Sequence, residues 1–338
     1  FELDLSVEGE ADYWFVVEQG MPDLVVQADF KDLTVLGAPQ LAIDSFSFDA
    51  AWTTRGESSE VWIENATVIS GAYVLEVPRT QLISSGLSWQ ALTEKWDISD
   101  AVNVLTGSGL LPGKANTILE TLNPRGSIDS LRLSVESWRA PLSAWSVSMA
   151  VTDATTDPYN KVPGLAGIDA SITADDAGAL AWINTRNFDL FLPQVYKAPI
   201  HLDSAVGRLA GRWQRGALYL KEGLFLAEAP DHNGIIEFEI DIPLSKPAVT
   251  TLQMRLAVAL ENAPISARHP YMPYRMPAEA YAWLNSALPQ GEIEQATFLW
   301  RGGFQPYGNA GQTMQLAAEL QNVELDYQAN WPAASIER

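Results

Sequence analysis

The residues best suited to acid–base or metal chemistry are few and scattered in this chain. Its three histidines, His201, His232 and His269, lie far apart in the sequence. No two of them have the short spacing with which paired imidazoles bind one zinc ion. There is no cysteine, which excludes thiolate catalysis, disulfides and cysteine-bound metals. We therefore expect no metal and no cofactor, and interpret the histidines as two loop residues and one strand-flanking residue.

Motifs of nucleophilic and phosphate chemistry are also missing. The sequence contains no Gly-x-Ser-x-Gly elbow, no Walker loop and no Gly-x-Gly-x-x-Gly fingerprint. Its 42 acidic residues offer many carboxylate pairs of the glycosidase kind. In a chain with only 21 basic residues, however, most carboxylates serve solubility. We expect no catalytic residues and no enzymatic activity.

Tryptophan is abundant enough to suggest a ligand. The chain has 12 Trp residues, and aromatic rings stack on sugars, so a polysaccharide-active protein is one hypothesis. A structural interpretation competes with it. A strand, a Trp and an Arg-Gly turn recur at irregular spacing around Trp52, Trp213 and Trp300. This weak repeat indicates long antiparallel strands joined by tight turns, with the three Trp residues capping an apolar face.

The elements that would position any site are mainly strands. Alternation of apolar and polar residues is clearest at 131–135, 236–242, 252–260 and 314–320. This period is typical of strands with one apolar face. Turn-forming residues separate the runs, as in Asp231-His232-Asn233-Gly234. The apolar phase changes between Leu320 and Val323, which predicts a bulge near Gln321-Asn322.

Helical spacing occurs in three short stretches. The first runs from about Trp89 to Leu105, with Ser88 as its candidate N-cap. The second runs from Lys114 to Leu122. The third, at 277–288, has proline in its first turn and a glycine just beyond its end.

Charge and composition exclude several classes of partner. The net charge of -21 repels nucleic-acid phosphates and anionic lipid headgroups, and the sequence has no basic stripe. No apolar run approaches the roughly 20 residues of a membrane-spanning helix, so we expect a soluble fragment of a longer protein. Hydrophobic residues make up 47% and charged residues only 19%. Some of the apolar surface is therefore available to a ligand.

Several segments resemble the YhdP family of AsmA-like proteins of Gram-negative bacteria. The matching stretches are 110–112 with 122–126, 163–170 leading to Leu180, 191–193 with 199–203 and 211–213, 271–273 with 283–284 and Gly291, and 323–327 with 331–332. Their order and spacing carry the resemblance, because no single motif is specific. Together they extend from about residue 110 to about residue 332.

The resemblance implies a fold and a role. The fold is mainly β, with long antiparallel strands in a strongly curved, groove-like sheet and a few short helices. The chain then divides into a β-groove segment at 1–87, a helical insertion at 88–124 and a β-groove segment at 125–338 with a short helix near 277–288, in one continuous elongated unit. The implied role is movement of phospholipid between inner and outer membranes, and hence outer-membrane homeostasis. The resemblance also implies a periplasmic body that is anchored in the inner membrane by a helix outside this fragment.

The alternating runs predict which side chains would touch acyl chains. Lipid tails need a dry apolar surface, since burying one methylene is worth about 0.8 kcal/mol. The expected lining residues are Phe238, Ile240, Ile242, Met254, Leu256, Val258 and Leu260. An ordinary sandwich core has the same period, so alternation alone does not separate a groove from a core. A second hypothesis is a non-enzymatic envelope scaffold that binds protein partners through its sheet edges.

Overall fold

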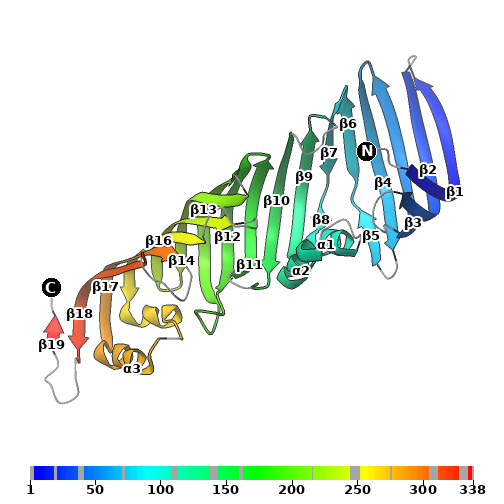
Figure 1. Cartoon of the computed structure of the whole chain (residues 1–338). Coiled ribbons are helices and arrows are strands. Elements are labelled where there is room, and N and C mark those ends of the chain that lie inside the picture. Colours follow the sequence, from blue (N-terminus) through cyan, green and yellow to red (C-terminus); the bar gives the residue numbers. More distant parts are fainter. Residues whose placement is uncertain are drawn as a thin grey trace. The chain divides into compact units, whose positions relative to one another are not determined.

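The computed structural model describes residues 4–18, 21–36, 42–70, 73–107, 113–137, 144–159, 163–214, 216–243, 252–274, 276–303, 311–326 and 334–336. Long antiparallel strands and a few short helices make up the chain, which confirms the predicted fold class (Figure 1). Two units are distinguished, residues 1–157 with 171–176 and residues 158–170 with 177–338. Each unit is a run of strands paired mostly in chain order.

The strands of the first unit form an antiparallel meander. They are β1 (Asp4–Glu18), β2 (Met21–Leu36), β3 (Ala42–Arg55), β4 (Ser58–Ser70), β5 (Tyr73–Val77), β6 (Thr80–Ser85), β7 (Ser88–Thr93), β8 (Trp96–Asp97), β9 (Arg125–Val135) and β10 (Trp145–Thr156). Strand β4 pairs with both β5 and β6, and β9 pairs with β7, β8 and β10. Strand β11 (Gly164–Asp175) is divided between the two units.

Two helices, α1 (Ile98–Gly107) and α2 (Gly113–Leu122), lie between β8 and β9. The second confirms the helix expected from 114 to 122. The prediction of a helix starting after Ser88 was wrong, because residues 88–93 form β7 and pair with β9. Helix α1 begins after Asp97, whose carboxylate accepts a hydrogen bond from the Ser99 backbone N–H at 2.7 Å. The helical insertion is therefore shorter than the predicted 88–124.

The second unit has the same meander pattern. Its strands are β12 (Gly178–Phe191), β13 (Ile200–Gln214), β14 (Ala217–Ala229), β15 (His232–Pro243), β16 (Gln253–Pro264), β17 (Gln290–Gly303), β18 (Thr313–Leu325) and β19 (Ala334–Ile336). Each pairs antiparallel with the next. The 3-10 helix η1 (Ile265–Tyr271) and α3 (Ala278–Ala287) lie between β16 and β17, and α3 confirms the helix expected near 277–288.

One predicted turn is misplaced by two residues. Asn233 and Gly234 lie inside β15, and the turn between β14 and β15 is at Pro230 and Asp231. Proline fixes φ in the range that such turns use, and this preference outweighed the Asn-Gly signal.

Left-handed backbone conformations recur within the long strands. The residues concerned are Asn65, Asp153, Asn187, Asn262 and Asn322, with φ between 50 and 55°. Asn and Asp are the side chains that tolerate this conformation best. At Asn65, Asp153 and Asn322 the strand pairing also shifts register, as in a β-bulge. Bulges bend a strand and increase its twist, so they curve the sheet at these points.

A glycine with positive φ lies against three of these left-handed residues, on the strand that precedes each. Gly126 lies next to Asp153, Gly167 next to Asn187 and Gly291 next to Asn322. The pairing of β17 with β18 shifts register beside Gly291. The bulge predicted near Gln321-Asn322 is thus confirmed.

Little of the chain forms a closed core. Among the described residues, the largest fully buried side chains are Val323 and Thr185. The accessible surface is 21755 Å². A compact monomer of this mass would expose about 13,600 Å², and two separate compact halves about 16,400 Å². Much surface is therefore open to solvent, and it includes large apolar side chains such as Tyr13, Trp182 and Leu316, which argues against the sandwich core that the strand pattern had left open.

Candidate functional site

Strand register in the second unit assembles apolar side chains into rows across the sheet. One row, from β12 to β18, consists of Ala181, Leu209, Gly223, Phe238, Leu256, Trp300 and Met314. The neighbouring row consists of Ile183, Gly207, Phe225, Ile236, Val258, Phe298 and Leu316. Alternate residues of a strand share a face, so both rows lie on the same face. We call it the apolar face.

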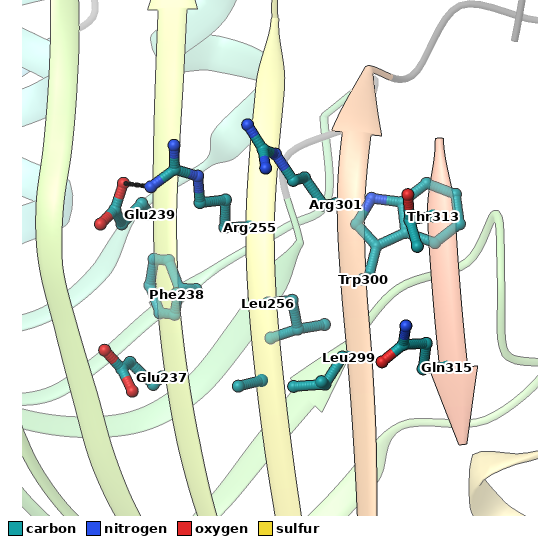
Figure 2. Close-up of a pocket in the computed structure, with 11 residues that line it drawn as sticks. Glu237, Phe238, Glu239, Arg255, Leu256, Leu299, Trp300, Arg301, Thr313 and Gln315 are labelled. Carbon is teal, nitrogen blue, oxygen red and sulfur yellow. Dashed lines mark hydrogen bonds and ion pairs between the residues drawn. The ribbon is translucent and has the colours of Figure 1, made fainter. Parts of the chain in front are cut away.

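All seven predicted lining residues lie on the apolar face, on β15 and β16. Phe238 is directly opposite Leu256, and Ile240 is opposite Met254 (Figure 2). The remaining three are each paired with an apolar residue or a glycine: Val258 with Ile236, Leu260 with Gly234, and Ile242 with Leu218. The structure therefore brings the set together, and its contact with lipid stays a prediction.

Two phenylalanines lie flat over glycines of the preceding strand. A Cβ atom at Gly207 would lie 2.5 Å from Cδ1 of Phe225, and one at Gly223 would lie 2.8 Å from Cε1 of Phe238. The two rings are parallel to within 4°, with centroids 6.0 Å apart. Larger residues would lift the rings, so the glycines hold them against the sheet.

The apolar face is open to solvent and offers almost no hydrogen-bonding groups. Phe238, Leu256 and Trp300 are half-buried, whereas Met314 is 67% and Leu316 73% exposed. The Trp300 indole N–H is buried and has no hydrogen-bond partner among the described residues. Neither row contains a charged side chain, so the arrangement suits hydrocarbon better than a polar ligand.

The first unit repeats this arrangement. A row from β1 to β10 consists of Phe15, Leu24, Trp52, Val61, Leu82, Ala91, Leu133 and Val147. Every member is apolar, and the row runs without interruption across all the long strands of the unit. Each unit therefore carries an apolar face of its own.

The tryptophans of the weak repeat share this location. Trp52 and Trp300 belong to the rows given above, and Trp213 is paired with Leu218, which is opposite Ile242. Gly56 and Gly216 provide the expected tight turns, with φ of 63° and 72°. The third turn was predicted wrongly, because Gly302 lies inside β17. The capping interpretation of the tryptophans fits these positions.

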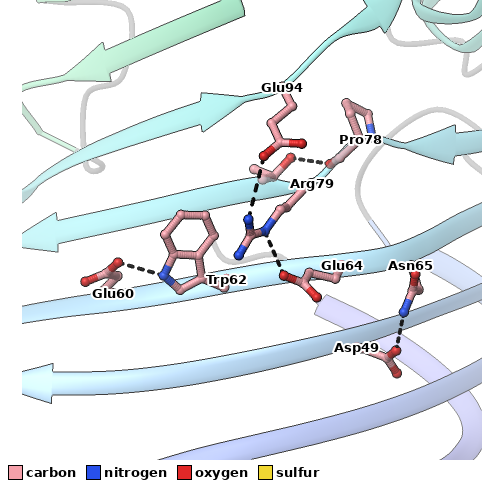
Figure 3. A network of polar contacts seen from close by, with 9 residues as sticks. Asp49, Glu60, Trp62, Glu64, Asn65, Pro78, Arg79 and Glu94 are labelled. Atoms are coloured by element: carbon pink, nitrogen blue, oxygen red, sulfur yellow. Dashed lines mark hydrogen bonds and ion pairs between the residues drawn. The ribbon is translucent and has the colours of Figure 1, made fainter.

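The opposite face of the first unit carries a polar network around Arg79 (Figure 3). The guanidinium lies 4.4 Å from the centre of the Trp62 ring and forms ion pairs with Glu64 at 2.7 Å and Glu94 at 3.7 Å. The Trp62 indole donates to Glu60 at 2.7 Å. The ion pairs are about half exposed, so each contributes at most about 1 kcal/mol. This is a solvated, stabilising surface.

The histidines take structural positions. His232, the first residue of β15, is buried between Asp231, 2.6 Å from its Nδ1, and the hydroxyl of Tyr271, 2.8 Å from its Nε2. Burial, with smaller contributions from Asp231 and Tyr196, raises the pKa of Tyr271 to about 12. His201 lies in β13 and not in a loop, and it contacts Asp189 at 2.7 Å. Among the described residues no group of His, Asp and Glu could hold a metal ion.

The segment carrying η1 and α3 is fixed at one end of the second unit. Arg268 donates to the carbonyls of Ile265 at 2.6 Å and Leu284 at 3.2 Å, which joins η1 to α3. Tyr274 donates its backbone N–H to the carbonyl of Val195 at 3.1 Å. The Tyr274–Val195 hydrogen bond connects this segment to the loop between β12 and β13.

Of the fourteen residues in the two rows, only Phe238, Leu256 and Val258 were among the lining residues predicted from the sequence. Phe298 and Trp300 are interleaved with Leu299, so their strand lacks clean alternation. Gly207 and Gly223 have no side chain that a hydrophobic pattern would register. Each glycine lies two residues before a leucine or an aromatic residue, and this was the only signal in the sequence. It can be interpreted only once the strand register shows which ring lies over which glycine.

Comparison with known proteins places the chain in a family. No helix in the described part of the chain is long and apolar enough to cross a membrane. No curated protein and no solved structure is similar enough to the chain to count as a match. The family model of the YhdP protein matches residues 2–336, so the chain belongs to the YhdP family, as the resemblance of its segments indicated.

Proposed function

We propose that this chain is a segment of a periplasmic hydrophobic groove that binds phospholipid acyl chains and conducts them between the inner and outer membranes. The observation that carries the proposal is the apolar face, whose rows cross seven strands without a charged side chain. Membership of the YhdP family supports a role in the cell envelope.

The dimensions of the apolar face suit an acyl chain. Half of a bilayer's hydrocarbon core is about 15 Å thick. Strands are about 4.8 Å apart, so one tail lying across them covers roughly three strands. Across β15 to β17 such a tail would lie on Phe238, Leu256 and Trp300, in one row. Since the contacts are apolar throughout, a tail can move to the next strands without breaking hydrogen bonds.

This mode of action requires no chemical step. A ligand that slides is held by its buried hydrocarbon area, at about 0.8 kcal/mol for each methylene. Polar headgroups would remain in water beside the open face. We propose accordingly that the chain is a conduit and not an enzyme, with no cofactor.

Photo-crosslinking in cells tests the proposal directly. A photoreactive residue in place of Phe238 or Leu256 in the full-length protein should form phospholipid adducts. The matched positions are Glu239 and Arg255, which directly follow and precede these residues and lie on the opposite face. Adducts confined to Glu239 and Arg255, or equal at all four positions, would show that the apolar face does not carry the lipid.

Native mass spectrometry separates the proposal from the scaffold hypothesis. The purified chain should retain phospholipid that Leu256→Asp releases. If the wild-type chain carries no lipid and instead binds protein through its edge strands, the scaffold hypothesis is the better account.

A further inference from the structure

The opposite face of the second unit carries an exposed apolar patch. Val206, Leu226 and Ile235 are directly opposite one another on β13, β14 and β15. Leu224 and Trp182 belong to the adjacent row of the same face, separated by Arg208. We call the five apolar residues, Trp182, Val206, Leu224, Leu226 and Ile235, the outer patch. Their exposed fractions are 54%, 47%, 45%, 56% and 43%.

The outer patch is more apolar than the exposed face of a sheet usually is. A sheet with one apolar face normally carries polar residues on the other. Here Leu224 and Leu226 flank Phe225, and Ile235 precedes Ile236, so these strands are apolar on both faces. Five large side chains at about half exposure present roughly 400 Å², the size of functional patches on soluble proteins. One side of a standard interface buries about 800 Å², so the patch suffices as the anchor of an interface.

A pocket of about 580 Å³ adjoins the outer patch (Figure 2). Eight of its lining residues share the patch's face, in two rows: Glu237, Ala257, Leu299 and Gln315, and Glu239, Arg255, Arg301 and Thr313. Phe238, Leu256 and Trp300, which belong to the apolar face, lie between these rows in sequence and also border the pocket. Leu224 of the outer patch is paired with Glu237, so patch and pocket are continuous.

The charges around the outer patch favour a cationic partner. Among the described residues, Glu228, Glu237 and Glu261 lie beside it without an ion-pair partner, although Ser204 donates to Glu228 at 2.9 Å. Two described arginines of this face are likewise without an ion pair, Arg186 in the row of Glu228 and Arg301 in the pocket, so the unpaired carboxylates outnumber the unpaired cations. The nearest cation, Arg208, is already paired with Glu222 at 2.8 Å. The chain as a whole has a net charge of -21, so a second copy would be repelled.

We propose that the outer patch and the adjoining pocket form a docking surface for a protein segment that presents two or three apolar side chains flanked by Lys or Arg. The apolar anchors cover the patch, and the basic flanks meet the unpaired carboxylates. An acyl chain fits this surface less well than the apolar face. Arg208 and Glu237 lie on either side of Leu224 in one row, and polar Asn184 and Thr297 bound the row of Val206, Leu226, Ile235 and Ala259. The proposal goes beyond lipid conduction, which uses the other face.

A peptide pair tests the chemistry of the partner. A peptide of alternating Leu and Lys should bind the purified chain with saturation, and a peptide of alternating Leu and Glu should not. The double variant Leu226→Ser, Ile235→Ser should weaken binding at least tenfold without changing charge. Val74→Ser with Leu87→Ser, at exposed positions of the first unit, should change it less than twofold. Equal binding by both double variants, or by both peptides, would overturn the proposal.

Crosslinking in cells identifies what occupies the surface. Photoreactive residues at Leu226 and Ile235 of the full-length protein should give protein adducts whose crosslinked segment is apolar with basic flanks. That segment, synthesised, should bind wild-type protein and not the double variant Leu226→Ser, Ile235→Ser. Adducts to phospholipid, adducts to a second copy of the chain, or no adducts would each overturn the proposal. Lipid adducts at Phe238 and Leu256 are scored separately, so failure here leaves lipid conduction standing.

Discussion

A carboxylate in the middle of the apolar face should weaken lipid binding about 30-fold with little effect on folding. Leu256 lies between Phe238 and Trp300 in the row, and it is only half-buried. In Leu256→Asp, two or three methylenes of a bound tail would lose their apolar contact, about 2 kcal/mol. This corresponds to a roughly 30-fold rise in the dissociation constant. Desolvating the carboxylate adds to the loss.

The assay compares this variant with Ala259→Asp. Ala259 is three residues away on β16 and faces the opposite side, so it introduces the same charge beside the other surface. Binding of a phospholipid with a fluorescent acyl chain should fall about 30-fold for Leu256→Asp and less than threefold for Ala259→Asp. Urea unfolding checks that both variants fold.

Two results would refute this reasoning. Equal losses in both variants would mean that net charge, and not the apolar face, governs binding. Unchanged binding in a folded Leu256→Asp would mean that lipid does not lie across this row.

Three stability predictions follow from single contacts. Gly291→Ala should lower the free energy of unfolding in urea by at least about 2 to 3 kcal/mol, because φ is +138° and a Cβ would lie 2.6 Å from a side chain of the next strand. The control Gly56→Ala, at φ +63° with nothing within 4 Å, should lower it by only about 1 to 2 kcal/mol. Gly223→Ala should cost about 1 to 3 kcal/mol by displacing a phenyl ring, against less than ~1 kcal/mol for Gly234→Ala, where the nearest atom is 3.4 Å away. Tyr271→Phe should lose about 1 kcal/mol with the hydrogen bond to the buried histidine. The pKa of Tyr271 is raised to about 12, so its contribution to stability is complete below pH ~10 and is lost as pH rises through 12. Over that range the free energy of unfolding of Tyr271→Phe should therefore fall less steeply than that of the wild-type chain.

Strand identity was predictable from the sequence because alternation is local, but register was not. The alternations at 236–242 and at 252–260 each predicted a strand with one apolar face. Nothing in either run indicates that Phe238 stands opposite Leu256, since pairing depends on the length of the intervening loop. The bulge at Asn322 was foreseen because a bulge shifts the phase of alternation, which is visible in one strand.

The wrong prediction of a helix at residues 88–93 has its cause in tertiary pairing. Residues 88–93 carry some helical spacing, yet β6 and β9 offer hydrogen-bonding partners on both sides and draw the segment into the sheet. The outer patch was missed for the opposite reason. Leu224-Phe225-Leu226 reads as a continuous apolar run, which is typical of a strand buried on both faces. Only the exposed fractions reveal that one of its faces is uncovered.

An open apolar face raises the question of what keeps two chains apart. Uncovered apolar surface promotes association, and a large net charge opposes it. The acidic residues supply a net charge of -21 at pH 7, which disappears near the sequence pI of about 4.4. Loss of this net charge should therefore allow chains to associate through the apolar face.

Sedimentation velocity at pH 7 and near pH 4.4 measures this balance. We expect monomers at neutral pH and self-association near the pI. Prior loading with phospholipid should suppress the association, because the tails would occupy the same face. The double variant Leu256→Asp, Met314→Asp should suppress self-association less at pH 4.4 than at pH 6. Near pH 4.4 the new carboxylates are close to their ordinary pKa of about 4, so they are partly protonated and carry less charge. Association that is indifferent to lipid would place the contact elsewhere, and the acidic surface would then need another explanation.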